Sequence, residues 1–235
     1  MIDADKNKLA AYHNGLKTGQ PFPAAIIFDM DGTLVATTEA DFLAWQRVFK
    51  DSGRELNFED YFPLLGKTST DLVHHTLKLK GAEAETALQN KMKYFERIVA
   101  EKGITLMPYT RQLLQALVNL KLPVALATSS RKKKMRLVLE EVELMKYFNV
   151  LVSGEEVKRG KPEPEIFLLT ARKLAVEPSK CLVVEDSLSG ILAAKAAGMK
   201  CIAVTNTHDA ADLSPADLVI HDFSELTIEV ISSLF

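Results

Sequence analysis

Six short apolar runs recur along the chain, and they constrain its fold more than any other feature of the sequence. They cover residues 24–28, 124–127, 150–152, 182–184, 202–204 and 218–220. None of them alternates between apolar and polar residues, which is typical of strands that are buried on both faces of a parallel sheet. Helical patterns lie between them at residues 109–120, 132–142, 163–174 and 188–197. This alternation predicts a doubly wound α/β fold built on a parallel sheet.

A long interruption of this alternation follows the first apolar run. Between about residue 37 and residue 102 we find only helical patterns, such as Phe42, Trp45 and Phe49 on one helix face. An all-helical block inserted at this point predicts a cap domain. We therefore expect an α/β core of residues 24–36 and 104–235, a helical cap of residues 37–103, and an N-terminal helical extension of residues 1–23.

Charge and composition limit the partners that the chain can have. The 235 residues carry a formal net charge of −2, so the surface lacks the general positive field that attracts nucleic acid. No apolar run approaches the length of a membrane span, and the N-terminus lacks a signal-peptide pattern. Cys181 and Cys201 belong to no metal or redox motif, so we expect buried, reduced thiols. We expect a cytoplasmic protein, monomeric or weakly oligomeric, that binds neither nucleic acid nor membranes.

Polar residues follow four of the apolar runs, at the points where the strands end. They are Asp29 and Asp31 after the first run, Thr128 and Ser129 after the second, Lys161 beyond the third, and Glu185 and Asp186 after the fourth. Open α/β sheets bind ligands at the carboxyl ends of their strands, so we expect these side chains to lie together. Each residue alone has an ordinary explanation as a turn residue or a helix cap. Their joint occurrence at four strand ends instead predicts a single site.

The chemistry of these residues suits transfer of a phosphoryl group. A carboxylate such as Asp29 can attack phosphorus to give an acyl phosphate, which water then hydrolyses. Asp31 can protonate the leaving oxygen and later remove a proton from water. Thr128 and Lys161 can stabilise charge on the group that is transferred.

The same site calls for a metal ion, because a carboxylate and a phosphate dianion repel each other. Asp29, Asp186 and Glu185 supply carboxylate oxygens, the ligands that Mg²⁺ prefers. We therefore expect Mg²⁺ as the cofactor and a small-molecule phosphate ester as the partner.

The ordered set of motifs resembles that of the haloacid dehalogenase superfamily. Residues 29–33, Asp-Met-Asp-Gly-Thr, are similar to its first motif, Thr128 to its second, Lys161 to its third, and Glu185 with Asp186 to its fourth. The resemblance begins at about residue 24 and implies a Rossmann-like core with an inserted cap. It also implies that the backbone carbonyl of Asp31 touches Mg²⁺. Dehalogenases and phosphonate hydrolases of the superfamily lack the second aspartate, so Asp31 favours phosphate-ester chemistry.

The helical insert resembles the cap of the branch that holds β-phosphoglucomutase and small sugar-phosphate phosphatases. The candidate substrate-binding residues are Thr37, Gly66, Lys67 and Ser129. The mutase has a cap histidine where this chain has Asp41, and a cap arginine near Ser69. Both changes remove partners for a second phosphate, although Lys67 or Arg97 could replace them.

These differences favour a Mg²⁺-dependent phosphatase that acts on a small phosphorylated metabolite, a sugar phosphate in particular, through an aspartyl-phosphate intermediate. A sugar-phosphate mutase is the alternative. A non-catalytic binding protein with the same fold is a third possibility, against which the intact set of motifs argues.

The basic run of residues 131–134, Arg-Lys-Lys-Lys, follows the second strand end. We expect it to be the solvated face of a helix, because the total charge is close to neutral. The alternative is recruitment of a phosphorylated substrate, for which Arg131 lies nearest the strand end. We also expect Gly32 to meet a backbone requirement of the turn.

Overall fold

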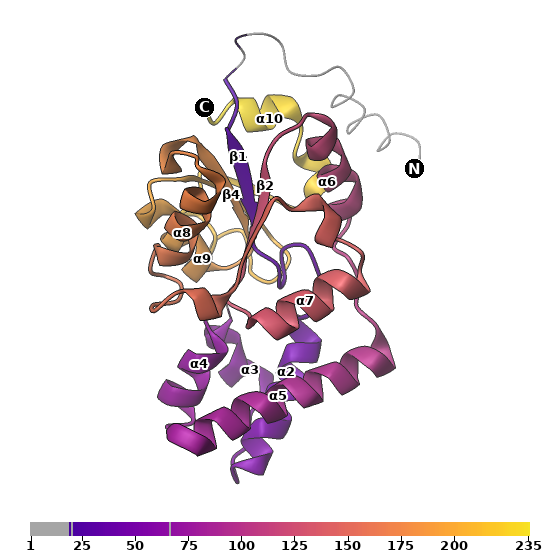
Figure 1. Cartoon of the computed structure of the whole chain (residues 1–235), viewed down its shortest axis with the longest axis vertical. Helices are drawn as coiled ribbons and strands as arrows, with labels where there is room; N and C mark the ends of the chain where they lie inside the picture. The colour runs from indigo at the N-terminus through magenta and orange to yellow at the C-terminus, as the bar shows by residue number, and fades with distance from the viewer. Residues whose placement is uncertain (1–18, 20, 66) are drawn as a thin grey trace.

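The computed structural model describes residues 19, 21–65 and 67–235. At its centre is a six-stranded sheet in which all neighbouring strands are parallel, in the order β3-β2-β1-β4-β5-β6 (Figure 1). The strands are β1 (Ala25–Phe28), β2 (Val124–Ala127), β3 (Val150–Val152), β4 (Cys181–Glu185), β5 (Lys200–Val204) and β6 (Leu218–Ile220). All six predicted strands are confirmed. The helix expected in the N-terminal extension lies outside the described residues.

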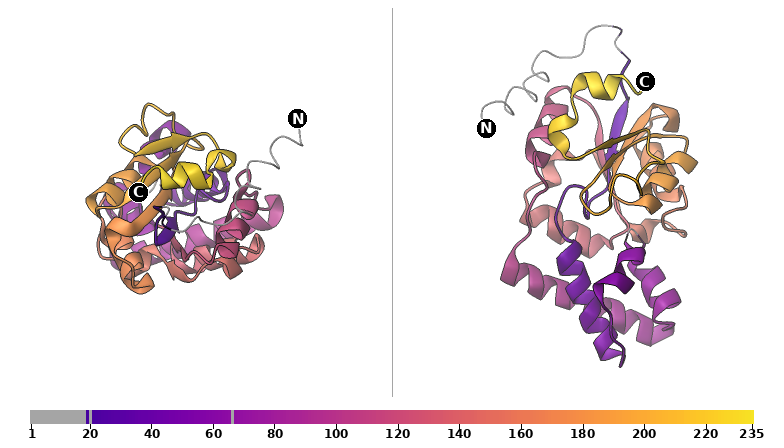
Figure 2. Two further views of the ribbon diagram at one scale, coloured as in Figure 1. Left: turned by 90° about the horizontal axis from the view of Figure 1, so that it is seen from above. Right: turned by 180° about the vertical axis from the view of Figure 1, so that it is seen from behind.

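Helices cover both faces of the sheet, as the predicted doubly wound fold requires. On one face lie α6 (Thr110–Asn119), α7 (Lys132–Glu141) and α10 (Ile228–Ser232), and on the other α8 (Glu165–Leu174) and α9 (Leu188–Ala196) (Figures 1 and 2). Ile26 and Phe28 of β1 pack into the first layer, whereas Ala25 and Ile27 pack into the second. All four side chains are fully buried, which explains why the strands contain no alternating polar residues.

Short 3₁₀ turns join several of these elements. They are η4 (Met145–Tyr147), η5 (Gly154–Glu156), η6 (Pro178–Lys180) and η7 (Phe223–Glu225). None of the helices in the described part of the chain combines the length and the apolar character that crossing a bilayer requires.

The segment between β1 and α6 forms a helical layer beyond the carboxyl ends of the strands (Figure 1). It contains α2 (Thr38–Asp51), α3 (Phe58–Tyr61), η2 (Phe62–Leu64), α4 (Ser69–Asp71), the π-helical turn η3 (Leu72–Thr76) and α5 (Gly81–Lys102). Trp45, Phe49 and Leu72 belong to a separate hydrophobic core within this layer. The inserted helical cap is therefore confirmed, whereas its exact boundaries at residues 37 and 103 stay predictions.

The strand order brings the predicted site residues together. Phe28 of β1 lies beside Leu126 of β2 on one side and Val184 of β4 on the other. The carboxyl ends of these three strands therefore meet at the middle of one sheet edge. The amide of Asp29 donates a 3.0 Å hydrogen bond to the carbonyl of Val184, which fixes the start of the loop that carries Asp31.

The cap touches the core at points outside this edge. The ring of Phe62 lies 4.7 Å from the ring of His208. Thr68 lies against Gly160, where an added Cβ atom would be only 2.6 Å from Cγ2 of Thr68. Glycine at this position therefore lets the cap rest directly on the loop that carries Lys161.

Candidate active site

A cavity lies where the carboxyl ends of the strands face the cap. Its core-side lining includes Asp29, Asp31, Thr128, Ser129, Glu185 and Asp186. Its cap-side lining includes Asp41, Trp45, Tyr61, Lys67 and Lys91. The cavity is therefore shared between the two parts of the molecule, and most of the residues predicted from the strand ends face it.

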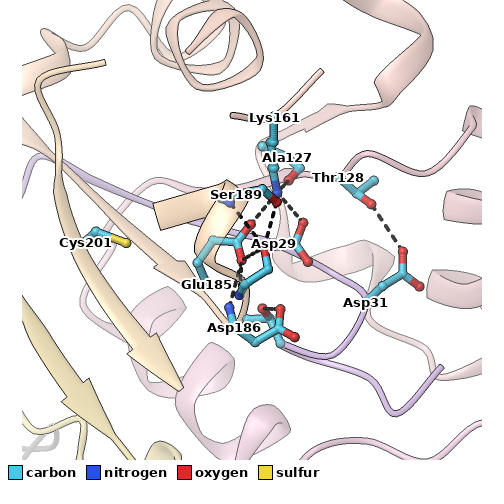
Figure 3. A network of polar contacts seen from close by, with 12 residues as sticks. Asp29, Asp31, Ala127, Thr128, Lys161, Glu185, Asp186, Ser189 and Cys201 are labelled. Atoms are coloured by element: carbon cyan, nitrogen blue, oxygen red, sulfur yellow. Dashed lines mark hydrogen bonds and ion pairs between the residues drawn. The ribbon is translucent and has the colours of Figure 1, made fainter. Parts of the chain in front are cut away.

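Asp29 is held by a buried ion pair with Lys161. The ammonium nitrogen of Lys161 lies 2.6 Å from Oδ1 of Asp29 and 2.6 Å from Oε1 of Glu185 (Figure 3). Burial raises the pKa of Asp29 well above its usual value, and the charge of Lys161 opposes that shift. Among the described residues, no hydrogen-bond donor reaches Oδ2 of Asp29. One oxygen of this carboxylate is therefore fixed, and the other is left free at the cavity.

Glu185 is seated at the start of α9. Its Oε2 accepts hydrogen bonds from the amides of Asp186 and Ser187, both at 2.8 Å, and from the Ser187 hydroxyl at 2.9 Å. A Cβ atom at Gly190 would lie 1.7 Å from Oε1 of Glu185, so glycine leaves the space that this carboxylate occupies. The local sequence thereby holds Glu185 where it can pair with Lys161.

Asp186 is oriented by two threonines that sequence reasoning missed. Thr33 donates a 2.8 Å hydrogen bond to Oδ1, and the hydroxyl of Thr207 donates to Oδ2. Gly32 adopts φ +82°, which confirms the expected backbone requirement, and a Cβ atom there would lie 2.2 Å from Oδ2 of Asp186. Thr33 belongs to the first motif, but Thr207 follows β5, where no sequence signal pointed to the site.

The three carboxyl groups of Asp29, Glu185 and Asp186 fit a divalent cation. Each offers one ligand atom, and these atoms lie within 4.8 Å of one another. Burial, together with the charge of Glu185, raises the pKa of Asp186 to about 7. Buried like charges at this spacing are unfavourable unless a cation offsets them, and hard oxygen donors suit Mg²⁺.

The ligand capacity of the three carboxylates differs. Four donor groups already point at Glu185, from Lys161, the Asp186 amide and Ser187. Two hydroxyl groups point at Asp186, whereas within residues 19, 21–65 and 67–235 Lys161 is the one side chain that donates to Asp29. Asp29 and Asp186 therefore keep the greater capacity to hold a metal ion.

Asp31 is surrounded by donors. Lys134 lies 2.6 Å from its Oδ1, which also accepts from Thr37, while Ser130 and Thr128 donate to Oδ2 at 2.6 Å and 3.4 Å. Burial on its own would raise the pKa of Asp31. The charge and hydrogen bond of Lys134, with the bonds from the hydroxyl groups, instead lower it to about 2. The carboxyl group of Asp31 is therefore ionised in this arrangement.

The prediction that residues 131–134 form a solvated face is wrong for Lys134. Its side chain is only 4% exposed, and its ammonium group contacts both Asp31 of the core and Asp41 of the cap. Asp41 in turn pairs with Lys91 of α5. Lys133 does lie at the surface, where its ammonium nitrogen is 2.6 Å from Glu96. Position on α7 relative to the cap, rather than residue type, separates the two lysines.

The predicted substrate-binding residues have different positions. Lys67 and Ser129 line the cavity, as expected. Thr37 is fully buried and donates to Asp31, so any effect on a substrate would pass through that carboxylate. Gly66 lies outside the described residues. Arg97, considered as a partner for a second phosphate, is exposed on α5 and does not line the cavity.

A parallel sheet with carboxylates and a lysine at its strand ends, covered by a helical cap, is the arrangement of a Rossmann-like hydrolase with an inserted cap. The chain belongs to the haloacid dehalogenase-like hydrolases, because the model of that family matches residues 26–204. This match confirms the resemblance drawn from the four motifs.

Individual relatives include both phosphatases and a mutase. Hexitol phosphatase A of Escherichia coli (strain K12) is 34% identical over 204 residues, which are 86% of this chain and 92% of that protein. Beta-phosphoglucomutase of Bacillus subtilis (strain 168) is 29% identical over 215 residues, 88% of this chain and 93% of that protein. The crystal structure of CbbY from Rhodobacter sphaeroides in complex with phosphate is similar with a TM-score of 0.81 and 26% identity, over 89% of this chain and 99% of that one.

Proposed function

We propose that the protein is a Mg²⁺-dependent phosphatase that hydrolyses the monophosphate ester of a small sugar or polyol. The observation that carries the proposal is the state of Asp29, whose Oδ1 is fixed by Lys161 and whose Oδ2 has no partner at the cavity in the part of the chain that the structure describes. A fixed carboxylate with one free oxygen is arranged to act as a nucleophile. The similarity to hexitol phosphatase A supports a polyol or sugar phosphate as the substrate class.

In the first step Oδ2 of Asp29 attacks phosphorus, and the bond from phosphorus to the leaving oxygen breaks. Asp31 is ionised before the ester binds, so for this step it takes up a proton from solvent or from the monoanion of the ester. It passes that proton to the leaving oxygen, which gives the free alcohol and an aspartyl phosphate. In the second step water gives a proton to Asp31 and attacks the phosphorus, the bond from phosphorus to Oδ2 of Asp29 breaks, and inorganic phosphate leaves with the Asp29 carboxylate restored. The ionised Asp31 that Lys134 favours is the form that this second step needs.

The remaining residues stabilise the group that is transferred. Thr128 is 1% exposed and lies beside Asp31 at the cavity, where its hydroxyl can bond a phosphoryl oxygen. Lys161 holds Asp29 and provides a fixed positive charge close to the attacking oxygen. Ser129 and Lys67 complete the set of candidate substrate contacts.

Asp29 and Asp186 would hold Mg²⁺, with Glu185 beside them and the backbone carbonyl of Asp31 as a further candidate ligand. When bound, the ion offsets the negative charge that the nucleophile and the phosphoryl group bring together. Asp31 and the hydroxyl group of Thr128 then orient the ester for in-line attack by Asp29.

The charge of the cavity favours the phosphatase over the mutase. Lys91 is already paired with Asp41. Among the described residues that line the cavity, Lys67 is the one cation without a carboxylate partner. A mutase must bind a second phosphate in its cap, and one exposed lysine offers little to hold it. The mutase nevertheless stays the alternative, because beta-phosphoglucomutase is among the relatives.

The test of the nucleophile is Asp29→Asn, with the exposed Asp209→Asn as a matched control. Release of phosphate from an aryl phosphate and from sorbitol 6-phosphate is measured with Mg²⁺ and with a chelator. We expect Asp29→Asn to be inactive but folded, and Asp209→Asn to match the wild type. Substantial activity in Asp29→Asn would remove Asp29 from the reaction, and an inactive wild type would favour a binding protein.

A separate measurement distinguishes the two enzymatic alternatives. The protein is given β-glucose 1-phosphate with and without β-glucose 1,6-bisphosphate. We expect free phosphate as the product in both cases. Formation of glucose 6-phosphate that depends on the bisphosphate would instead assign the mutase reaction.

A further inference from the structure

The cap side of the cavity contains a polar group that neither the motifs nor the reaction explains. Tyr61, at the end of α3, lines the cavity and is only 4% exposed. Its ring packs against Phe42 at 5.5 Å and Phe58 at 6.2 Å between centroids. These two contacts hold the aromatic ring of Tyr61 within the cap.

The hydroxyl of Tyr61 is left without a protein partner. Among the described residues, no group donates to it or accepts from it. Every side-chain oxygen or nitrogen in the described part of the chain that is wholly shut off from solvent has a hydrogen-bond partner. The unpartnered hydroxyl of Tyr61 must therefore reach the open space of the cavity. The hydroxyl of a buried tyrosine normally has a hydrogen-bond partner, so the unpaired hydroxyl of Tyr61 points to a ligand.

The neighbours of Tyr61 in the cavity are the buried pair Asp41 and Lys91. The carboxylate of Asp41 also contacts Lys134, so each oxygen of Asp41 has one cationic partner. An ammonium group has three N–H donors, and Asp41 is the one carboxylate that Lys91 pairs with in the described residues. Tyr61, Asp41 and Asp31 line the same cavity. Burial raises the pKa of the Tyr61 hydroxyl, and the charges of Asp41 and Asp31 add to that shift.

Together these side chains offer hydrogen-bonding capacity without net charge. Tyr61 can donate or accept, Lys91 can donate, and the lone pairs of Asp41 can accept. Two carboxylates, Asp31 and Asp41, balance the two ammonium groups of Lys91 and Lys134. A second phosphate dianion would meet these carboxylates at close range, whereas alcohol groups would meet donors and acceptors that suit them. Leu65 and Leu72 add apolar surface for a carbon chain.

We propose that Tyr61, Asp41 and Lys91 form a leaving-group subsite that binds the hydroxyl groups of an uncharged, polyhydroxylated alcohol, with Tyr61 as the residue that determines specificity. The subsite rests on the proposed phosphatase function and deepens it. Asp31 lines the same cavity, and in the proposed arrangement of the substrate it contacts the part of the ester between the phosphoryl group and the cap. The phosphoryl group then lies at Asp29, the leaving oxygen at Asp31, and the carbon chain with its hydroxyl groups at Tyr61.

The test uses Tyr61→Phe, which removes one hydroxyl and keeps the ring. Its matched control is Tyr94→Phe in α5, because the hydroxyl of Tyr94 lies at the surface and donates to Asp51. For wild type and both variants, kcat/KM is measured on sorbitol 6-phosphate, on glycerol 3-phosphate and on phenyl phosphate, which has no hydroxyl group on its leaving group. Thermal melting of each variant checks that the fold is kept.

We expect Tyr61→Phe to lower kcat/KM for the best hydroxylated substrate by roughly tenfold, the loss of one buried hydrogen bond. Activity on phenyl phosphate should change less than about twofold, and Tyr94→Phe should leave both activities unchanged. Equal losses on the aryl and the hydroxylated ester, or no loss on either, would overturn the subsite. So would a wild type that prefers phenyl phosphate to both hydroxylated esters. A wild type that hydrolyses none of the esters would overturn the proposed function itself.

Discussion

Lys134 donates a 2.6 Å hydrogen bond to Asp31 in the core, and the same ammonium group contacts Asp41 in the cap. Asp41 continues the chain of contacts to Lys91 on α5. The network therefore runs from the predicted acid/base across the cavity into the inserted domain. It links the position of the cap to the surroundings of Asp31, through a lysine that no sequence pattern distinguishes from its neighbours.

The Lys134→Met substitution tests how much this network stabilises the fold. Removing the ammonium group leaves two partly buried carboxylates with one cationic partner fewer. We expect a loss of roughly 3 kcal/mol in the free energy of unfolding, at the low end for a broken buried pair because the Asp31 side chain is 23% exposed. Urea unfolding measures the change. Lys132→Met, at an exposed position on the same helix, should cost less than about 0.5 kcal/mol. Equal effects of both substitutions would contradict the network.

The Gly32→Ala substitution tests the contact between the first motif and Asp186. Gly32 combines φ +82° with a Cβ position only 2.2 Å from Asp186 Oδ2, so alanine adds a steric conflict to the backbone strain. Gly53 has φ +70° and no atom within 4 Å of its Cβ position, which makes Gly53→Ala the matched control.

We expect Gly53→Ala to cost about 1 kcal/mol of stability from the left-handed backbone alone. Gly32→Ala should cost more, and it should also weaken Mg²⁺ binding because Asp186 is displaced. Calorimetric titration with Mg²⁺ and urea unfolding give the two quantities. Unchanged Mg²⁺ affinity in Gly32→Ala would show that Asp186 does not need its present position to bind the ion.

The raised pKa of Asp186 predicts how pH and metal act together. In the unfolded chain an aspartate titrates near about 3.9. Burial and the charge of Glu185 raise the pKa of Asp186 to about 7 in the folded protein. The folded state then binds this proton more tightly, so the contribution of Asp186 to stability is complete below about pH 4 and is lost as pH rises through about 7.

Mg²⁺ should reverse this loss, because the cation replaces the proton as the partner of the carboxylates. We expect the melting temperature of the metal-free protein to fall between about pH 5 and about pH 7, and Mg²⁺ to raise it more at the higher pH. Melting curves with Mg²⁺ or with a chelator measure both effects. Asp186→Asn should lose most of this dependence. A metal shift that is equal at both pH values would count against the carboxylate cluster as the site.

The two cysteines provide a prediction about chemical reactivity. Cys181 and Cys201 are fully buried, and burial raises the pKa of the Cys181 thiol to about 11. Thiolate is the reactive form, so the native protein should react very slowly with a disulfide reagent at about pH 8. After unfolding, both thiols should react at once. Rapid reaction of the native protein would mean that β4 and β5 open readily.

Much of the fold was accessible from local sequence. Each strand of the sheet contains a continuous apolar run. Such runs can be recognised in the sequence because a parallel strand that is covered on both faces buries every side chain. The motif residues could be assigned to one site for a related reason, since the carboxyl ends of the strands in this topology share one edge of the sheet. Asp29, Lys161 and Glu185 therefore lie together, as their places in the chain predicted, although the ion pairs between them were not predicted.

Other parts of the site depend on packing between distant segments. Thr207 reaches Asp186 from the loop after β5, and Tyr61 enters the cavity from a short cap helix. Neither residue stands in a pattern that marks it, because a single threonine or tyrosine in a loop or short helix has many ordinary explanations. Their roles appear only once the cap lies over the strand ends.

The sequence by itself determined the parallel sheet, the inserted cap and the four strand ends that meet at Asp29 and Asp31. Only the tertiary structure decided what surrounds that pair. Lys134 and Lys133 are adjacent and chemically identical, yet one is buried between Asp31 and Asp41 while the other pairs with Glu96 at the surface. The physical reason is that successive residues of a helix point in different directions, and the cap, far away in sequence, contacts both lysines but buries only Lys134.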